Sequence, residues 1–301
     1  MGLRLTFLGT AGSVPTQQRS LPAIALRYEG QLILFDCGEG TQRQMIRGKI
    51  GFSKPMQIFI THLHGDHIFG LQGLLQTMSL LGRREKLGIF GPLGISSFIE
   101  AARSCIEFHL RFPVEIKEVK GGTVYQGRGY KILAKWTKHS LPNLAYAFVE
   151  NEKPGKFYPQ KVRRLGIPEG PLWHRLQHGK RVKLPNGKVV EPAEVVGRPR
   201  RGVRVVYTGD TSPCRAVLKL AEGADLLIHD STFDDELVER AKSDWHSTPS
   251  QAAKIAREAS VKKLILTHIS GRYVDAKLLM EQAKKVFKNV EVAEDFMQVA
   301  V

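Results

Sequence analysis

The chain has 301 residues and a formal net charge of +16, because 45 Lys and Arg residues outnumber 29 Asp and Glu residues. Its 42% hydrophobic and 25% charged residues are ordinary for a globular protein and exclude a disordered or collagen-like chain. The longest uncharged stretch, residues 68–82, contains Gly70, Gly73 and Gln76 and is shorter than the about 20 apolar residues of a membrane-spanning helix, so we expect no membrane association.

Short apolar runs bounded by Gly or Pro predict strands, and apolar residues at helical spacing predict helices. In the first half of the chain the predicted strands are residues 3–8, 23–28, 31–35, 57–61, 87–90, 114–119, 130–136 and 144–149, and the predicted helices are 42–47, 68–81 and 96–105. After residue 201 the predicted strands are 203–207, 226–229 and 264–266, and the predicted helices are 212–221, 249–259 and 275–286. This alternation predicts a layered α/β sandwich.

Positive charge is concentrated in residues 151–201, which contain 13 Lys and Arg residues and four acidic residues. Pro and Gly interrupt any regular period there, and apolar residues are sparse. We therefore expect an extended, flexible arm inserted into a single domain that spans residues 1–301. Because clustered basic residues displace counterions from phosphate chains, the arm predicts a polyanionic partner.

The three cysteines are Cys37, Cys105 and Cys214. They are odd in number and widely spaced, so they do not form a disulfide framework. Disulfides are rare in reducing compartments, and this pattern therefore predicts a cytoplasmic protein.

Three histidines and an aspartate directly follow the predicted strand 57–61, in the order His62, His64, Asp66 and His67. Neutral imidazole and carboxylate groups are common zinc ligands. On extended backbone His62 and His64 project to the same side, and Gly65 permits the turn that brings Asp66 and His67 close by. The spacing predicts a metal site at the end of this strand.

Further ligands are expected downstream, since four side chains cannot complete two metal sites. His139, Asp210 and His268 each stand just beyond a predicted strand, where α/β sheets carry their active-site loops. The seven side chains suffice for two divalent ions, with an acidic residue bridging and coordination positions left for water or substrate. Zinc is expected, although the same ligand types suit other divalent ions.

The motif H-x-H-x-D-H, with its later His, Asp and His, resembles the metallo-β-lactamase superfamily, and further stretches resemble the ribonuclease Z family within it. These stretches span almost the whole chain and are FLGT at 7–10, LFDCGEGTQ at 34–42, YTGDT at 207–211, HST at 246–248 and HISGRY at 268–273. The resemblance implies an α/β (α+β) fold, a four-layer αββα sandwich. It also implies a metal-dependent endoribonuclease that cleaves the 3′ trailer from precursor tRNA, leaving a 3′-OH on the tRNA and a 5′-phosphate on the trailer.

The resemblance also implies roles for the metal-binding side chains, with two Zn²⁺ in each subunit. One zinc ion would be held by His62, His64 and His139, the second by Asp66, His67 and His268, and Asp210 would bridge them.

Four residues are expected to act on the substrate. His246 matches the histidine that protonates the departing ribose 3′ oxygen, and Asp66 is suited to orient the attacking water and accept its proton. Ser270 and Arg272 match residues that lie near the scissile phosphate.

Three positions depart from the family pattern. Gln17 and Ser20 stand where the motif P-x-K-x-R-N has Lys and Asn, which leaves open how the CCA end of a tRNA is treated. Asp230 stands where Glu is frequent, and this shorter carboxylate can still orient a neighbouring histidine.

The basic arm is similar to the family's flexible exosite that clamps tRNA. Within it we expect Arg163, Arg164, Lys180 and Arg181 to bind precursor tRNA, mostly through phosphates and shape. The family commonly forms homodimers in which one arm serves the other subunit's site, so a second copy of the chain is an expected partner.

Aromatic rings can stack on any RNA base, and the chain has three tryptophans. Trp173 lies in the arm, whereas Trp136 and Trp245 do not. We expect Trp136 to lie in the core.

Two other functions stay open from the sequence. The metal motif alone permits a metallo-hydrolase acting on a small phosphodiester, a thioester, a lactam or another ester-type substrate, because the superfamily supports many chemistries. An RNA-binding protein with structural metals is the second alternative, although structural zinc sites are usually rich in cysteine and no cysteine lies near the His cluster.

Overall fold

The computed structural model describes residues 2–105 and 109–301. The chain divides into two compact units, a larger one up to Phe148 together with Arg204–Val301, and a smaller one formed by Val149–Val203. The smaller unit contains the predicted basic arm. Within the described residues no helix is long and apolar enough to cross a membrane.

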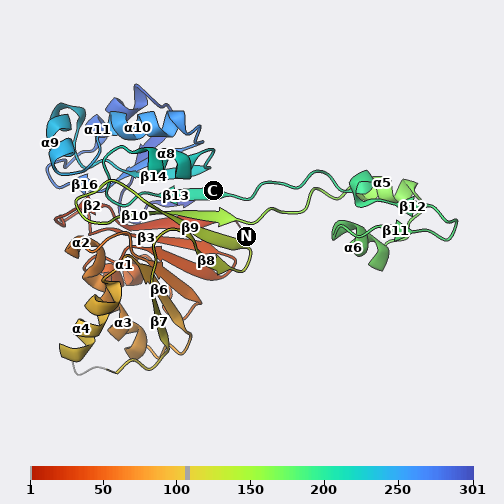
Figure 1. Ribbon diagram of the computed structural model, residues 1–301, viewed down its shortest axis with the longest axis horizontal. Helices are drawn as coiled ribbons and strands as arrows, with labels where there is room; N and C mark the ends of the chain where they lie inside the picture. Colours follow the sequence, from red (N-terminus) through yellow and green to blue (C-terminus); the bar gives the residue numbers. More distant parts are fainter. Residues whose placement is uncertain (1, 106–108) are drawn as a thin grey trace. The chain divides into compact units, whose positions relative to one another are not determined.

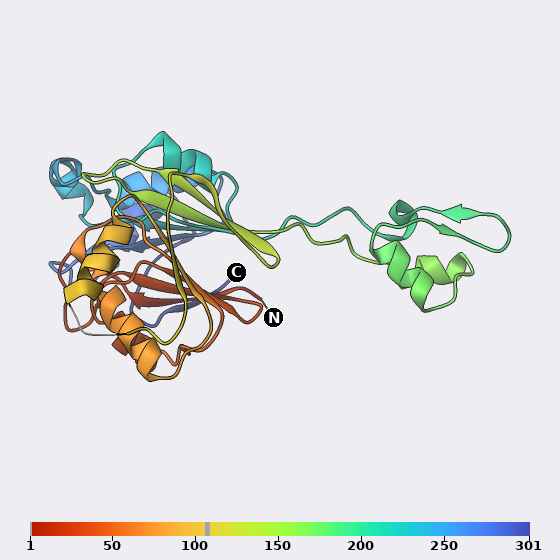
Figure 2. The same cartoon turned by 60° about the horizontal axis from the view of Figure 1, so that its bottom comes forward.

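Two large sheets form the centre of the larger unit, each with seven strands in the described part of the chain (Figures 1 and 2). The first sheet has the order β18 (Gln298–Ala300), β1 (Arg4–Gly9), β3 (Ala23–Tyr28), β4 (Gln31–Phe35), β5 (Met56–Phe59), β6 (Leu87–Gly91), β7 (Val114–Glu118). Strands β4 to β7 are parallel, so the loops after them leave from one edge of the sheet.

The second sheet has the order β17 (Val290–Val292), β15 (Leu264–Thr267), β14 (Leu226–Asp230), β13 (Arg204–Tyr207), β10 (Leu144–Glu150), β9 (Tyr130–Trp136), β8 (Gly122–Gly127). Strands β13, β14, β15 and β17 are parallel, and β8 and β9 form an antiparallel pair. The carboxyl ends of the parallel strands therefore lie together at one edge, as they do in the first sheet.

Buried aromatic side chains join the inner faces of the two sheets. Phe35 of the first sheet packs against Tyr146 and Tyr207 of the second, with ring centroids 6.1 and 5.9 Å apart. The Tyr146 hydroxyl also donates a hydrogen bond of 2.8 Å to the carbonyl of Ile60. Large aromatic rings bury much apolar area, and here they fix the two sheets against each other.

Helices cover the outer faces of both sheets (Figures 1 and 2). The first sheet carries α1 (Thr41–Arg47), α2 (Gly65–Ile68), α3 (Gly70–Leu80) and α4 (Ile95–Cys105). The second carries α8 (Arg215–Ala221), the short 3₁₀ turn η1 (Asp235–Leu237), α9 (Val238–Ser243), α10 (Pro249–Glu258) and α11 (Lys277–Lys284). The order helix, sheet, sheet, helix confirms the predicted four-layer sandwich.

Most predicted elements are present, with differences at their ends. The predicted helix 68–81 corresponds to α3, and the short α2, which ends at Ile68, precedes it. Strands β8, β17 and β18 and helix α9 were not predicted. These are short segments with alternating or partly exposed side chains, so their apolar pattern is weak.

The predicted arm contains regular structure that its interrupted sequence pattern did not indicate. The smaller unit contains α5 (Pro159–Arg164), α6 (Pro171–Gln177), the hairpin of β11 (Val182–Lys183) and β12 (Val189–Val190), and α7 (Pro192–Val195). Its few apolar side chains meet in one cluster: Val162, Ile167, Trp173, Leu176, Val182, Leu184, Val190 and Val195. The prolines begin helices rather than prevent them, because a proline is tolerated in the first helical turn.

Candidate active site

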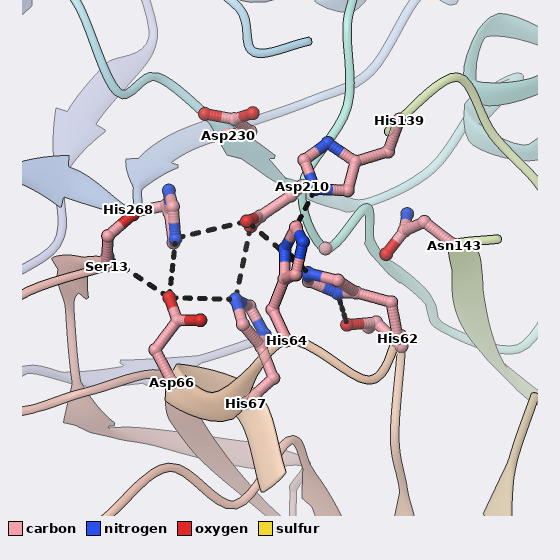
Figure 3. Close-up of polar contacts among 12 residues, drawn as sticks. Ser13, His62, His64, Asp66, His67, His139, Asn143, Asp210, Asp230 and His268 are labelled. Carbon is pink, nitrogen blue, oxygen red and sulfur yellow. Dashed lines mark hydrogen bonds and ion pairs between the residues drawn. The ribbon is translucent and has the colours of Figure 1, made fainter. Parts of the chain in front are cut away.

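The ends of four strands from the two sheets meet at one place (Figure 3). The segment that follows β5 carries His62, His64, Asp66 and His67; those after β9, β13 and β15 carry His139, Asp210 and His268. His64 is extended and helix α2 begins at Gly65, which sets Asp66 and His67 in the first helical turn. A Cβ at Gly65 would contact the exposed Phe69 ring, which would have to move to make room for it.

All seven predicted ligands are brought together, and they form two groups of possible metal ligands that share one residue. The first group is His62, His64, His139 and Asp210; the second is Asp66, His67, Asp210 and His268. The ligand atoms of each group lie within 4.8 Å of one another. Asp210 Oδ2 lies 3.6 Å from His62 Nε2 and 3.2 Å from His268 Nε2, so this carboxylate stands between the groups (Figure 3).

The outer ring nitrogens of the histidines are held by other groups, which sets the direction of each ring. His67 Nδ1 donates to Asp36 Oδ2 at 2.7 Å, and His139 Nδ1 lies 3.1 Å from the carbonyl oxygen of Trp245. The Nε2 atoms of His67 and His139 consequently point into the site. Such outer contacts select the tautomer of metal-binding histidines.

Two more histidines are oriented through threonine hydroxyls. Thr61 Oγ1 donates to Asp36 at 3.0 Å and lies 3.0 Å from His62 Nδ1. Because the hydroxyl proton is directed to the carboxylate, the oxygen accepts from the His62 ring. Thr232 Oγ1 likewise donates to Asp230 at 2.7 Å and accepts from His268 Nδ1 at 2.8 Å.

Asp36 is a positioning residue that the sequence reasoning missed. It occurs in the stretch that resembles the family, but no role was assigned to it. It is buried directly after β4 and binds Thr61, His67 and the Tyr207 hydroxyl, which donates at 2.7 Å. One signal could have revealed the role of Asp36. It is a carboxylate directly after a buried strand, and that strand is next to the one that precedes the histidines.

The buried atoms of the site fit a divalent cation. His67 Nε2 and Asp210 Oδ1 are buried and lie 3.4 Å apart as an ion pair, and neither has a hydrogen-bond partner among the described residues. Buried polar atoms without a partner are rare in proteins, and a bound cation would supply one for both. Imidazoles and carboxylates are the donor set of zinc and similar ions.

The electrostatics favour the metal-binding protonation state at His62 and Asp210, whereas at His67 the Asp210 and Asp36 carboxylates outweigh burial and raise the pKa well above its usual value. Burial lowers the pKa of His62 well below its usual value, and the neighbouring His67 lowers it further, so the neutral ring is favoured. Burial alone would raise the pKa of Asp210, but His268 and His67 outweigh it and keep this carboxylate charged.

His246 lies beside the second group of ligands. Its ring centroid is 5.1 Å from that of His268 and 5.3 Å from that of His139. Its Nδ1 donates to Asp230 at 2.9 Å. Burial would lower the pKa of His246, but the Asp230 carboxylate raises it to about 9, so this imidazole keeps a proton at neutral pH.

The remaining predicted substrate-binding residues of the larger unit lie close to His246. Arg272 Nε donates to Ser270 Oγ at 3.2 Å, and the guanidinium lies 5.0 Å from the ring centroid of Phe233. The Phe233 ring in turn lies 6.0 Å from that of His246. Arg272 is exposed and Ser270 is partly buried, so both are accessible to a substrate.

The predicted basic residues of the arm, Arg163, Arg164, Lys180 and Arg181, are all exposed on the smaller unit. Trp173 is buried in the apolar cluster of that unit and is therefore not a free stacking surface. The expectation that Trp136 is a core residue was wrong, because it is 38% exposed at the end of β9.

Comparison with known proteins agrees with this geometry. The chain is 49% identical to a ribonuclease Z of Methanosarcina acetivorans over 99% of this chain and 98% of that protein. The chain belongs to the ribonuclease Z family. A ribonuclease Z of Archaeoglobus fulgidus is 46% identical over 100% of this chain and 98% of its own.

Two family models each match part of the chain, and a solved structure agrees with this membership. Residues 3–97 match the model "Anti-Pycsar protein Apyc1", and residues 173–269 match "Beta-lactamase superfamily domain". The crystal structure of human tRNase Z, short form, superimposes with a TM-score of 0.72 at 30% identity and covers 98% of both chains.

A metallo-β-lactamase fold protein of Bacillus subtilis, YhfI, is 19% identical and superimposes with a TM-score of 0.71, covering 99% of both chains. The metallo-β-lactamase fold is thereby confirmed. As a member of the ribonuclease Z family, the chain is an endoribonuclease, a hydrolase of phosphodiester bonds.

Proposed function

We propose that this enzyme removes the 3′ trailer from precursor tRNA, leaving a 3′-OH on the tRNA and a 5′-phosphate on the trailer. The observation that carries the proposal is the pair of ligand groups sharing Asp210, with the His246 ring 5.1 Å from that of His268, in a chain of the ribonuclease Z family. Two-metal sites of this kind suit in-line displacement at phosphorus.

Two zinc ions per subunit are part of the proposal. The first would be held by His62, His64 and His139, the second by Asp66, His67 and His268, and Asp210 would contact both. Zinc of this kind lowers the pKa of water from about 15.7 to about 7 and neutralises phosphate oxygens.

Asp66 is suited to orient the attacking water, and His246 is suited to protonate the leaving oxygen. Burial would raise the pKa of Asp66, but hydrogen bonding to His268 and the charge of His67 lower it below its usual value, so the group is an ionised carboxylate that can accept a hydrogen bond from the attacking water. The Ser13 backbone N–H donates to Asp66 Oδ2 at 3.1 Å and helps to orient it. His246 would donate its proton to the ribose 3′ oxygen as that oxygen leaves.

Ser270 and Arg272 are suited to bind the phosphate that is cut. Arg272 always carries its charge, and its guanidinium presents several N–H donors to phosphate oxygens. Its contact with Ser270 Oγ holds both side chains on the same side of the site, next to Phe233.

The smaller unit is proposed to hold the body of the tRNA. Its exposed Arg163, Arg164, Lys180 and Arg181 would contact phosphates with little sequence preference, because structured RNA is recognised mostly by shape and backbone. A homodimer, in which each subunit offers this unit to its partner, is the proposed assembly. The three free cysteines support a reducing compartment, and we place the reaction in the cytoplasm.

The test is incubation with a 3′-extended precursor tRNA, with and without a chelator, followed by mapping of the cut and its end groups. We expect one chelator-sensitive cut near the 3′ end of the mature sequence, leaving 3′-OH and 5′-phosphate ends. Faster turnover of bis(p-nitrophenyl) phosphate than of the precursor would favour the small-phosphodiester alternative. Cleavage that survives complete metal removal would contradict the proposed metal dependence.

A further inference from the structure

A cavity of about 650 Å³ lies beside His246, and the proposed reaction does not yet use it. The side chains that line it include His246, Trp245, Lys138, Lys242, Pro213 and Val238. On the basis of the proposed function, we propose that this cavity binds the base of the nucleotide immediately 5′ to the cut, stacked on Trp245. Its volume lies within the range of small-molecule sites, about 300–1,000 Å³.

The backbone of Trp245 is fixed beside the active site. The Trp245 carbonyl contacts His139 Nδ1, and the next residue's N–H donates to Ala241 at the end of α9. Trp245 has a φ of 63°, a left-handed backbone conformation that residues other than glycine seldom adopt. Such backbone is concentrated at functional sites. Although the backbone is fixed, 38% of the residue remains exposed.

The surroundings of the ring suit a nucleotide. Lys138 Nζ lies 5.3 Å from the centroid of the Trp245 ring, so a cation sits over an electron-rich aromatic surface. Lys242 adds a second positive charge, partly balanced by Glu239 at 3.8 Å. An aromatic surface that stacks on a base, with cations for the neighbouring phosphates, is the usual means of binding unpaired nucleic acid.

The position of the cavity decides which nucleotide it takes. His246 would protonate the 3′ oxygen that leaves, and this oxygen belongs to the ribose on the 5′ side of the cut. The base on that same ribose lies within one nucleotide of His246, and Trp245 is the adjacent residue. The cavity therefore fits the last nucleotide of the product that keeps the 3′-OH.

The first experiment compares Trp245→Ala, Trp245→Phe and the control Trp136→Ala on precursor tRNA and on bis(p-nitrophenyl) phosphate. Trp136 is also 38% exposed but does not line the cavity, so it is a matched control for the loss of an exposed indole. We expect Trp245→Ala to lower kcat/KM for the precursor by roughly 5- to 150-fold, the range for loss of one base–aromatic stack. Trp245→Phe restores most of the loss, and Trp245→Ala lowers hydrolysis of the small ester far less than cleavage of the precursor.

The second experiment places an abasic nucleotide either directly 5′ or directly 3′ to the cut. If the base stacks on Trp245, the wild-type enzyme cleaves the 5′ abasic substrate as slowly as Trp245→Ala cleaves the intact precursor. Combining Trp245→Ala with the 5′ abasic substrate then lowers kcat/KM no further than either change alone. The inference is wrong if Trp245 is coupled to the 3′ nucleotide instead, or if Trp245→Ala and Trp136→Ala have equal effects. Either result would leave the proposed function standing. Absence of 3′ cleavage by the wild-type enzyme would overturn the proposed function as well.

Discussion

Asp36 and Asp230 hold matching positions on opposite sides of the site. Each carboxylate accepts from the Nδ1 of one histidine and from the hydroxyl of a threonine that orients a second histidine. The partners are His67 and Thr61 for Asp36, and His246 and Thr232 for Asp230. One carboxylate thus orients two proposed metal ligands, whereas the other orients one ligand and the proposed general acid.

Removing the support on the Asp36 side is expected to weaken metal binding. Asp36→Asn or Thr61→Val should lower metal affinity by roughly 10- to 100-fold, because the orienting partners of metal-binding histidines typically contribute that much. Titration of the apo protein with zinc measures it. Thr77→Val is the matched control, since Thr77 Oγ1 donates to Gln42 away from the site. Equal affinities in Thr61→Val and Thr77→Val would exclude a role for the threonine bridge.

Loss of His246 should slow the reaction and leave binding intact. His246→Ala is expected to lower kcat by roughly 10²- to 10⁴-fold, the usual contribution of a general acid. Metal content and precursor tRNA affinity should stay close to wild type. Asp230→Asn should lower kcat in the same direction, because the pKa of His246 then falls toward the value that burial dictates. Loss of metal in His246→Ala would instead make this residue a ligand.

The shared position of Asp210 predicts a difference in metal stoichiometry. Asp210 belongs to both ligand groups, whereas His139 belongs to the first group only. We expect Asp210→Ala to lose both metal ions and His139→Ala to retain about one per chain. Elemental analysis of the purified variants measures the ratio. The same stoichiometry in both variants would contradict a bridging role for Asp210.

The smaller unit can be removed at a defined point. Lys153 and Arg200 exchange both backbone hydrogen bonds, each 2.9 Å long, so their strands are already paired as at the end of a hairpin. Replacing residues 154–199 with Asn-Gly, a favoured two-residue turn, should close the chain without strain.

This deletion is expected to raise KM for precursor tRNA and to leave the hydrolysis of bis(p-nitrophenyl) phosphate unchanged. The slope of log affinity against log salt concentration should become shallower by roughly 0.7–0.9 for each phosphate that the shortened enzyme no longer neutralises. A variant with Arg163, Arg164, Lys180 and Arg181 changed to Gln keeps the unit's apolar cluster and tests charge alone. If the deletion lowers activity equally on precursor tRNA and on bis(p-nitrophenyl) phosphate, the unit supports the fold instead.

Residue patterns alone predict the alternation of strands and helices, the ligands His62 to His67 and their downstream partners. These follow from local patterns: apolar periodicity within a strand, and polar side chains directly after it. The same local patterns failed in the basic segment, where sparse apolar residues such as Val162 and Val190 come together only when the chain folds back on itself.

The contacts among the site's side chains, in contrast, depend on the packing of distant parts of the chain. Asp210 stands between two ligand groups because β13 pairs with β14, while His62 comes from the opposite sheet. The bond from His67 to Asp36 joins residues 31 positions apart, and the exposure of Trp245 beside His246 depends on how α9 ends. Distances across the two sheets are set by packing of remote strands, which no local periodicity encodes.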